Sequence, residues 1–356
     1  MTALPPGSTI GILGGGQLGR MLAMAAAQLG YRVHIYAPEE TSIAAEVAAE
    51  WTRGDYDDVA ALRAFAAKVD VVTYEFENIH HAPLVALSEV ATVRPSVQAL
   101  EIAQDREAEK TFIDDLGGRT APWASVGDRA ELDAALAKIG TPAILKTRRL
   151  GYDGKGQARI MTRADADAAW ATIAGQPAIL EGFVSFEREF SVLLARSADG
   201  VMQFWDCPDN VHDHGILALS TVPAGPIVAK QAEEAKALAR KVADSLDYVG
   251  VLTLEFFAGK DGPVFNEMAP RVHNSGHWTI EGAITSQFEN HIRAICGLPL
   301  GDTRLAAGKV EMRNLIGDGA ENVENILADP SNHLHLYGKE EGRPGRKMGH
   351  VTRLFL

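Results

Sequence analysis

Two glutamates close to residue 260 have the spacing of paired metal ligands. The apolar run at residues 251–257 predicts a strand, and Gly-Lys-Asp-Gly at 259–262 predicts a tight hairpin turn. A turn at that point places Glu255 nearly opposite Glu267 on adjacent antiparallel strands. Two carboxylates so close together repel each other unless a cation lies between them. Because hard oxygen ligands beside nucleotide phosphates suit Mg²⁺, the pair indicates a magnesium site.

A set of side chains that suits an oxyanion follows directly. It combines one guanidinium, two imidazoles, an amide and a hydroxyl, from Arg271, His273, Asn274, Ser275 and His277. Metal ligands that lead into an anion pocket indicate phosphoryl transfer, in which positioning and charge stabilisation supply most of the catalysis.

A glycine-rich turn near the N-terminus could meet a phosphate. Residues 14–19, Gly-Gly-Gly-Gln-Leu-Gly, follow a predicted strand and open a predicted helix, as the dinucleotide-binding fingerprint does. Such a turn offers backbone N–H groups and a helix N-terminus to a phosphate. A dinucleotide site also needs an acid at the end of the second strand, where this chain has Tyr-Ala-Pro at 36–38. Three interpretations remain: NAD binding, another phosphate ligand, and a purely structural turn.

A second glycine-rich segment, residues 148–157, lies between two predicted strands. It carries three glycines within six residues and cations on both sides. Such a loop can fold over a triphosphate, although it lacks the Gly-Lys-Ser/Thr ending of a Walker loop. The alternative is a solvated basic hairpin tip. Lys146, on the preceding apolar strand, either extends to solvent or points at a phosphate.

The next two strands carry glutamates that suit a nucleotide. Residues 181–184, Glu-Gly-Phe-Val, follow an apolar run and suit a strand end whose backbone groups read the edge of adenine. Glu187 and Glu189 alternate along the following strand, so both point to one face. A strand with one solvated face explains the same pattern without a ligand.

Two polar clusters are candidate substrate contacts. Glu75, Glu77 and Asn78 end a strand of the N-terminal sheet, where open parallel sheets bind ligands, although a surface loop is the alternative. The second cluster is cationic and comprises Lys339, Arg343, Arg346 and Lys347. A Pro-Gly turn inside it would hold its side chains in a fixed array, which supports a phosphate clamp, although a solvated charged face is the alternative.

The elements that must position these residues change in kind along the chain. Strands and helices alternate between residues 8 and 100, which predicts a parallel sheet covered by helices. From residue 142 shorter strands predominate, with helices at 163–174, 229–246 and 280–295. The fold class is therefore α/β in the N-terminal part and α+β beyond it. Strands are predicted at 9–13, 32–36, 69–74, 143–147, 158–161, 178–181 and 189–195, and a polar helix at 104–116.

The composition describes an ordinary soluble globular protein. Its 356 residues suffice for about two or three domains. With 47 acidic and 34 basic residues the net charge is −13, which argues against a nucleic-acid surface. No apolar run approaches the ~20 residues of a membrane span, and no signal region precedes the first strand. We therefore expect a cytoplasmic protein that binds neither nucleic acid nor membranes.

The order of these motifs resembles the ATP-grasp ligases over nearly the whole chain. Within that superfamily, segments 14–20, 151–157, 266–278 and 343–350 are similar to the 5-(carboxyamino)imidazole ribonucleotide synthetases. Residues 269–278, Ala-Pro-Arg-Val-His-Asn-Ser-Gly-His-Trp, are close to a signature of that family. The resemblance implies an ATP-grasp fold in three domains and a homodimer. The domains are an N-terminal, Rossmann-like pre-ATP-grasp domain at 1–103, an ATP-grasp domain at 104–300 with a lid at about 118–182, and a β-rich C-terminal domain at 301–356.

The resemblance also implies roles for individual residues. ATP phosphates would be contacted by Arg106 and Lys146 and covered by Gly151, Tyr152, Asp153, Gly154, Lys155, Gly156 and Gln157. The rest of the nucleotide would be bordered by Glu181, Gly182, Phe183, Val184, Glu189 and His212. One or two Mg²⁺ ions would be ligated by Glu255 and Glu267 beside Asn266, and bicarbonate would be held by Arg271, His273 and Asn274. Aminoimidazole ribonucleotide would be received by Gln17, Leu18, Glu75, Tyr152, Lys339, Arg346 and Lys347. The catalytic set would be Lys146, Tyr152, Arg271, His273 and Asn274.

The implied reaction is the ATP-dependent carboxylation of aminoimidazole ribonucleotide by bicarbonate in purine biosynthesis. One departure concerns the metal, since many ATP-grasp enzymes have an asparagine ligand where this chain has Ala269. The nearest alternative is a formate-dependent glycinamide ribonucleotide transformylase of the same superfamily. From other classes, an NAD(P)-dependent dehydrogenase built on the turn at 14–19 and a non-catalytic nucleotide sensor are the alternatives.

Overall fold

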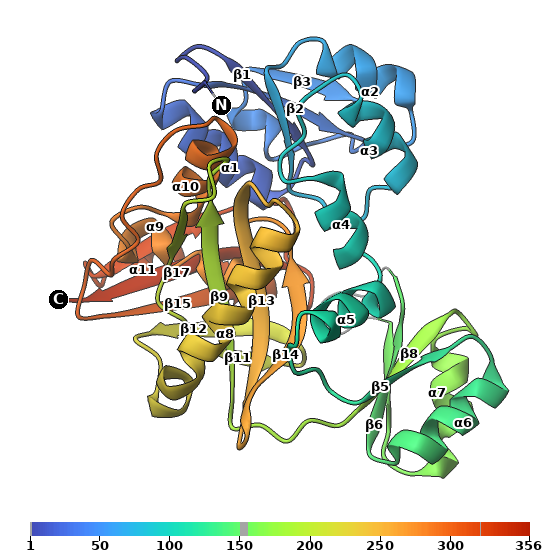
Figure 1. The fold of residues 1–356 in the computed structure, drawn as a ribbon. Helices are drawn as coiled ribbons and strands as arrows, with labels where there is room; N and C mark the ends of the chain where they lie inside the picture. The colour runs from blue at the N-terminus through green and yellow to red at the C-terminus, as the bar shows by residue number, and fades with distance from the viewer. Residues whose placement is uncertain (1, 150–155, 321) are drawn as a thin grey trace.

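Three β-sheets organise the computed structural model, which describes residues 2–149, 156–320 and 322–356 (Figure 1). A parallel sheet lies at the N-terminal end, a small antiparallel sheet stands to one side, and a nine-stranded sheet joins the rest of the chain. The predicted change from α/β to α+β is therefore confirmed. The predicted domain boundaries at 103 and 300 stay predictions.

The N-terminal sheet has the strand order β3-β2-β1-β4, with parallel pairing throughout. The central strand β1 is buried because helices cover the sheet, as the predicted alternation requires. Leu13 at the end of β1 pairs with Tyr74 at the end of β4, so the segments after both strands meet at one edge. The elements are β1 (Thr9–Leu13), α1 (Gln17–Gln28), β2 (Arg32–Ala37), η1 (Ala45–Val47), β3 (Glu50–Arg53), α2 (Val59–Ala66), β4 (Val71–Tyr74), α3 (His81–Ser88) and α4 (Val97–Ala103).

The small antiparallel sheet has the order β5-β8-β6-β7 and forms, with two helices, a unit that we call the lid. It stands apart from the body at the lower right of Figure 1. Leu145 and Leu180 turn to one face, where the helices cover them and form a separate core. The neighbouring residues Lys146 and Glu181 therefore point to the opposite face. The elements are β5 (Trp123–Val126), α6 (Arg129–Ile139), β6 (Ala143–Thr147), β7 (Gln157–Ile160), η2 (Arg163–Asp165), α7 (Ala166–Thr172) and β8 (Ala178–Gly182).

The large sheet runs β14-β13-β9-β11-β12-β15-β17-β16, with β10 beside β9. Alternation along β13 directs Leu252 and Leu254 to the core formed with α8. Val251 faces the opposite core, with α10 and the N-terminal helix α1. Its elements are β9 (Arg188–Arg196), β10 (Met202–Phe204), β11 (Asp209–Asp213), β12 (Ile216–Val222), α8 (Pro226–Ser245), β13 (Gly250–Gly259), β14 (Gly262–Ala269) and α10 (Gln287–Ile295).

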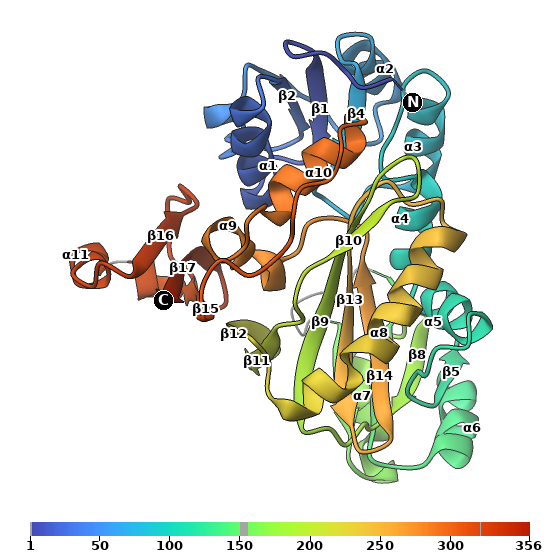
Figure 2. The same cartoon turned by 60° about the vertical axis from the view of Figure 1, so that its left-hand side comes forward.

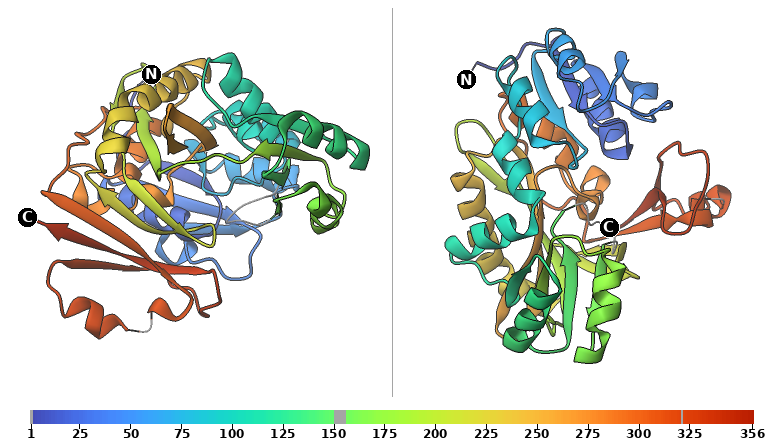
Figure 3. Two further views of the ribbon diagram at one scale, coloured as in Figure 1. Left: turned by 90° about the horizontal axis from the view of Figure 1, so that it is seen from below. Right: turned by 90° about the vertical axis from the view of Figure 1, so that its right-hand side faces the viewer.

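The C-terminal strands extend the large sheet rather than forming a separate one, because β15 pairs with β12. They project from the body together with α11 (Figure 2, Figure 3). The helix α5 connects the N-terminal unit to the lid and confirms the predicted polar helix. The remaining elements are α5 (Arg106–Asp115), η3 (Asn274–Gly276), α9 (Thr279–Gly282), β15 (Lys309–Ile316), η4 (Gly317–Ala320), α11 (Val323–Leu327), β16 (Asn332–Leu336) and β17 (Lys347–Phe355).

The prediction of one helix over residues 280–295 is wrong. The helix α9 ends at Gly282, and Ala283 and Ile284 then run extended beside the segment at 304–305. Ser286 starts a new helix, α10, because its side chain accepts a hydrogen bond from the backbone N–H of Glu289. Among the described residues, no helix combines the length and apolarity that crossing a membrane would require.

Candidate active site

A cavity of about 310 Å³ lies where the open face of the lid meets the large sheet, and we call it the main cavity. It brings together the charged ends of strands that are far apart in sequence. Of the predicted ATP and metal contacts, its lining contains Arg106, Lys146, Gln157, Glu181, Gly182, Phe183, Val184, Glu189, His212, Glu255, Asn266 and Glu267. It also contains His273, Asn274 and Lys347.

Lys146 and Glu181 form a buried ion pair on the lid side of the main cavity. Lys146 Nζ lies 2.6 Å from Glu181 Oε2. Burial alone would raise the pKa of Glu181, but the ammonium groups of Lys146 and Lys110 lower it to about 2. Glu181 is therefore ionised at neutral pH. Burial lowers the pKa of Lys146, and the Glu181 carboxylate opposes this by stabilising the ammonium form, which suits a phosphate.

Glu255 and Glu267 face each other on the opposite side of the main cavity. The register of β13 and β14 pairs the two residues directly, as the predicted hairpin required. Burial raises the pKa of Glu255 to about 7, and the charge of Glu267 acts in the same direction. The Arg106 guanidinium lies 3.3 Å from the Glu267 carboxylate.

The two carboxylates fit Mg²⁺. This ion uses one or two protein carboxylates and completes its coordination with water and substrate phosphates. Within residues 2–149, 156–320 and 322–356, no group of three or more His, Cys, Asp or Glu side chains could hold a metal ion. A magnesium ion between Glu255 and Glu267 would therefore depend on the nucleotide for its other ligands.

Glu189 and His212 extend the cavity along β9 and β11. His212 Nδ1 lies 2.8 Å from Glu189 Oε2. Burial lowers the pKa of His212, but Glu189 and the charge of Glu255 outweigh this and raise it above the ordinary value. The pair therefore places an imidazole that protonates readily close to the carboxylate of Glu255.

Arg271 and His273, which were predicted to hold an anion, follow the end of β14, and of the two only His273 lines the main cavity. Arg271 Nε lies 2.9 Å from Glu77 Oε1, so the N-terminal domain supplies a carboxylate that orients the guanidinium. His273 Nδ1 accepts a hydrogen bond from the backbone N–H of Ser275 at 3.3 Å, which leaves the proton on Nε2. Burial lowers the pKa of His273 well below its ordinary value, and the charge of Arg271 adds to this. His273 is therefore a neutral donor beside a cationic guanidinium.

Asn274 is held by a residue from the C-terminal strands. Its side-chain amide exchanges two hydrogen bonds with that of Asn314, at 2.9 and 2.7 Å. Asn314 Nδ2 also donates to the carbonyl oxygen of Leu217 at 2.8 Å. The orientation of Asn274 is thus fixed from β15, some distance from it in sequence.

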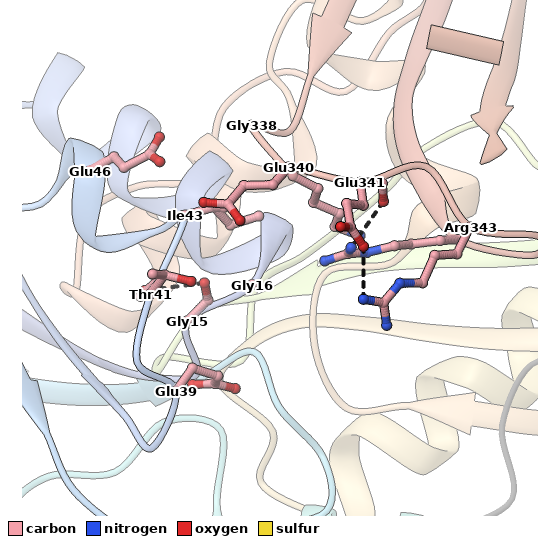
Figure 4. Close-up of a pocket in the computed structure, with 13 residues that line it drawn as sticks. Gly15, Gly16, Glu39, Thr41, Ile43, Glu46, Gly338, Glu340, Glu341 and Arg343 are labelled. Atoms are coloured by element: carbon pink, nitrogen blue, oxygen red, sulfur yellow. Dashed lines mark hydrogen bonds and ion pairs between the residues drawn. The ribbon is translucent and has the colours of Figure 1, made fainter. Parts of the chain in front are cut away.

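A second cavity, of about 460 Å³, lies between the glycine turn and the C-terminal cationic segment (Figure 4). Gly15, Gly16 and Ser42 border it on one side, and Lys339 and Arg346 on the other. Contacts within the cationic segment hold it in shape: Arg343 pairs with Glu341 at 3.0 Å, Arg346 Nη1 donates to the Glu341 carbonyl at 3.0 Å, and Lys339 Nζ donates to the Lys347 carbonyl at 2.7 Å. The side chain of Lys347 lines the main cavity instead.

The glycine turn holds an internal carboxylate. Glu75 Oε1 accepts a hydrogen bond from Gly16 N at 2.6 Å, at the start of α1. A Cβ at Gly14, where φ is +125°, would lie 2.4 Å from the Glu75 side chain, so the turn needs glycine to admit it. Because a carboxylate already occupies the N–H group that a dinucleotide phosphate would use, the turn does not have the features of an NAD site.

The remaining predicted site residues belong to the segment 151–156 and to the start of α1. Gly151, Tyr152, Asp153, Gly154 and Lys155 lie outside the described residues. Gly156 is described, and its carbonyl accepts a hydrogen bond from Thr147 N at 2.8 Å. The Leu18 side chain is buried in the core of the N-terminal domain, whereas Gln17 is half-buried at the start of α1.

Two residues near the site were missing from the predicted set, because Lys110 contacts Glu181 and Asn314 holds Asn274. Glu77, which was predicted as a possible substrate contact, instead pairs with Arg271. Only Lys110 had a usable signal, because it follows Arg106 by four residues on a predicted helix and so shares its face.

Comparison with known proteins covers most of the chain. Family profiles match a ribonucleotide synthetase preATP-grasp domain at residues 7–104, an ATP-grasp domain at 111–288, and a phosphoribosylaminoimidazole carboxylase C-terminal domain at 311–355. These matches confirm the predicted ATP-grasp fold class with its N-terminal parallel sheet and β-rich C-terminal part.

Individual relatives are similar along almost their whole length. The N5-carboxyaminoimidazole ribonucleotide synthase of Brucella melitensis is 55% identical over 99% of this chain and 98% of that protein. The N5-carboxyaminoimidazole synthetase of Staphylococcus aureus complexed with ADP superimposes with a TM-score of 0.95, at 38% identity over 99% of this chain and 95% of that one. The Aspergillus clavatus synthase in complex with ADP and 5-aminoimidazole ribonucleotide gives a TM-score of 0.91, at 30% identity over 98% and 94%.

Proposed function

The chain belongs to the family of N5-carboxyaminoimidazole ribonucleotide synthases, and from that membership we propose that it carboxylates 5-aminoimidazole ribonucleotide with bicarbonate at the expense of ATP. The single observation that carries the proposal is the main cavity. It combines paired metal carboxylates, a lysine for phosphate and a neutral histidine within one lining. ATP is the nucleotide, and the reaction is that of a carbon–nitrogen ligase in purine biosynthesis.

ATP binds in the main cavity in this proposal. Its adenine lies against the strand end at 181–184, its ribose near Glu189, and its phosphates near Lys146 and Arg106. The support is that all these residues line one cavity and that Lys146 and Arg106 have basic side chains. The predicted cover formed by Gly151, Tyr152, Asp153, Gly154, Lys155, Gly156 and Gln157 remains part of the proposal.

Mg²⁺ is the proposed metal, held by Glu255 and Glu267 beside Asn266, as one or two ions. When bound, it would offset the charge of the phosphate groups during transfer. The support is the raised pKa of Glu255, since a buried carboxylate that faces another carboxylate is stabilised in its ionised form by a cation.

Bicarbonate is the proposed acceptor of the γ-phosphoryl group. Its carbon is a poor electrophile, and phosphorylation converts it to carboxyphosphate, a mixed anhydride with phosphate as its leaving group. Arg271 supplies positive charge, and His273 donates from Nε2 to an anion that lies beside it. Asn274 is the third proposed contact, oriented by Asn314. Because carboxyphosphate hydrolyses readily, the lid must keep water out.

The ribonucleotide is proposed to occupy the second cavity, with its phosphate at Lys339 and Arg346 and its imidazole directed toward the main cavity. Gln17, Leu18 and Glu75 border the glycine turn on the other side, and Leu18 could contribute only backbone atoms. Lys347, which lines the main cavity, would lie between the two substrates, and Tyr152 stays a proposed contact of the ribonucleotide. The exocyclic amine then attacks the carboxyl carbon, or the carbon dioxide released from it, and phosphate departs.

The quaternary structure rests on the resemblance, and the location rests on the composition and the lack of a long apolar run. We propose a homodimer and a cytoplasmic protein, without nucleic-acid or membrane partners. Multi-angle light scattering at several protein concentrations tests the first, and twice the chain mass is the expected result.

The experiment that tests the function is ADP release from ATP with Mg²⁺ and bicarbonate, with and without aminoimidazole ribonucleotide. We expect release that requires the ribonucleotide and Mg²⁺. Replacing bicarbonate by formate, and the ribonucleotide by glycinamide ribonucleotide, tests the transformylase alternative, and activity with that pair alone would overturn the proposal. Binding of NADH, measured by fluorescence quenching, tests the dehydrogenase alternative.

A further inference from the structure

Lys110 is a fully buried lysine that touches two parts of the main cavity at once. Its helix, α5, lies between β14 and the lid (Figure 1). Lys110 has no solvent exposure, and its Nζ donates to the carbonyl oxygen of Asn266 at 2.7 Å. The same atom lies 3.3 Å from Glu181 Oε1 and 5.3 Å from the centre of the Phe265 ring. The residue therefore connects the lid strand β8 to the metal-bearing strand β14.

The neighbouring residue strengthens the connection to β14. Glu109 is also buried and accepts a hydrogen bond from Met268 N at 2.6 Å. Lys110 thus binds the carbonyl oxygen of the residue before Glu267, and Glu109 binds the N–H group of the residue after it. These two hydrogen bonds hold the backbone of Glu267 in place and so fix the point from which its side chain extends.

Glu181 is shared between two lysines. Its two carboxylate oxygens are paired separately, Oε2 with Lys146 at 2.6 Å and Oε1 with Lys110 at 3.3 Å. This buried carboxylate and its two ammonium partners together form a trio with a net charge of +1. If Lys146 turns to a phosphate, Lys110 still neutralises Glu181. Without Lys110, the turn of Lys146 would leave Glu181 as an unpaired buried charge.

We propose that Lys110 is a positioning residue for ATP, which holds Glu181 so that Lys146 can bind phosphate and which fixes β14 at the metal carboxylates. Lys110 does not line the main cavity itself, so it acts through Glu181, Lys146 and Glu267. The inference rests on the proposed ATP site. It extends that site to a residue that does not touch the nucleotide.

The test compares ADP binding and kinetics in Lys110→Met, Lys110→Arg and the double variant Lys110→Met/Glu181→Gln. In Lys110→Met we expect the Kd for ADP and the KM for ATP to rise about tenfold or more, with the KM for the ribonucleotide within about twofold of the wild type. Lys110→Arg retains the charge and should restore part of the affinity. In the double variant Glu181 carries no charge, so Lys146 is again available and ADP should bind more tightly than in Lys110→Met.

Lys241→Met is the matched control, because Lys241 also donates to a backbone carbonyl, that of Leu116 at 3.1 Å, but lies on the exposed surface of α8. Its constants should equal those of the wild type. Unchanged ADP affinity in Lys110→Met, or a double variant that binds no better than the single one, would overturn the inference. If Lys110→Met does not fold, the ADP affinities of Lys110→Arg and of the double variant are compared instead, and they test the same inference. ADP binding is measured by calorimetry and needs no turnover. A failure of the proposed carboxylation is therefore distinguishable, because wild-type protein would then bind ADP but would not use the ribonucleotide.

Discussion

Glu255 and Glu267 lie directly opposite each other on β13 and β14, joined by a turn of only two residues. Both strands belong to the large sheet, and a β-bulge follows Glu255 in the pairing. The pairing therefore holds the backbones of the two glutamates next to each other. Burial raises the pKa of Glu255 most, and the charge of Glu267 raises it further, so a cation bound between the two carboxylates would favour their ionised forms.

Loss of a metal carboxylate should abolish turnover without unfolding the protein. In Glu267→Gln the side chain keeps its size but loses the charge that binds Mg²⁺, so we expect kcat to fall about a hundredfold or more. Steady-state ADP release measures the fall, and circular dichroism checks the fold. Glu233→Gln is the control, because Glu233 lies on the exposed side of α8. Turnover equal to that of the wild type would remove Glu267 from the metal site.

The second cavity predicts a selective effect on the ribonucleotide. Arg346→Ala removes a guanidinium from its lining, so the KM for aminoimidazole ribonucleotide should rise about tenfold or more, because an arginine–phosphate contact is lost. The KM for ATP should stay within about twofold of the wild type. Arg313→Ala, at an exposed position of β15, controls for a general change in charge. A larger rise in the KM for ATP than in the KM for the ribonucleotide would show that the second cavity is not the ribonucleotide site.

Asn314 should influence catalysis through Asn274. Asn314→Ala leaves the Asn274 amide and the Leu217 carbonyl without partners, at a cost of about 1–3 kcal/mol in the free energy of unfolding. We expect kcat to fall more than either KM changes, because Asn274 would lose its orientation. Urea unfolding and steady-state kinetics give the two quantities. A destabilised variant with normal kcat would restrict Asn314 to a structural role.

Acid should weaken the contact between the N-terminal sheet and the large sheet through His291. Its Nδ1 accepts from Val251 N at 3.1 Å and its Nε2 lies 2.8 Å from Thr73 Oγ1. Burial lowers the pKa of His291 to about 3, below the ordinary value near 6.5 of the unfolded chain. Between these two pH values the unfolded state binds a proton and the folded state does not. The contribution of His291 to the free energy of unfolding is therefore fully present above about pH 6.5 and is lost as the pH falls toward 3.

Lowering the pH from 7 to 5 should reduce the free energy of unfolding by about 2 kcal/mol through protonation of His291 in the unfolded state. In His291→Gln the loss over the same interval should be smaller by about that amount, although the variant is less stable at pH 7. His214→Gln, at an exposed position, should behave as the wild type does. Urea titrations at the two pH values measure this loss. An equal loss of unfolding free energy in all three proteins would show that His291 does not cause the pH dependence.

The parts of the site that could be predicted from sequence are those that depend on local geometry. The Glu255–Glu267 pairing follows from a two-residue turn between two strands. The orientation of Lys146 and Glu181 follows from alternation along β6 and β8, because apolar neighbours fill one face. The parallel N-terminal sheet likewise follows from a regular succession of strands and helices.

Contacts that depend on distant segments could not be predicted. Asn314 and Asn274 are joined only because β15 extends the large sheet beside β12, a pairing that neither strand's sequence specifies. The strand β11 has the sequence Asp-Asn-Val-His-Asp, whose polar character hides a strand that lies between two others. Arg346 and Lys347 line different cavities, because neighbouring residues of an extended chain point to opposite sides.

The most direct test is the transfer of carbon from labelled bicarbonate to the ribonucleotide. Purified protein is incubated with ¹⁴C-bicarbonate, ATP, Mg²⁺ and aminoimidazole ribonucleotide, and acid-labile label in the product is compared with ADP released. We expect one labelled carboxyl group per ADP, no label when ATP or the ribonucleotide is omitted, and none in Glu267→Gln. ADP release without labelled product in the complete mixture, or label transfer that does not need ATP, would contradict the assigned reaction.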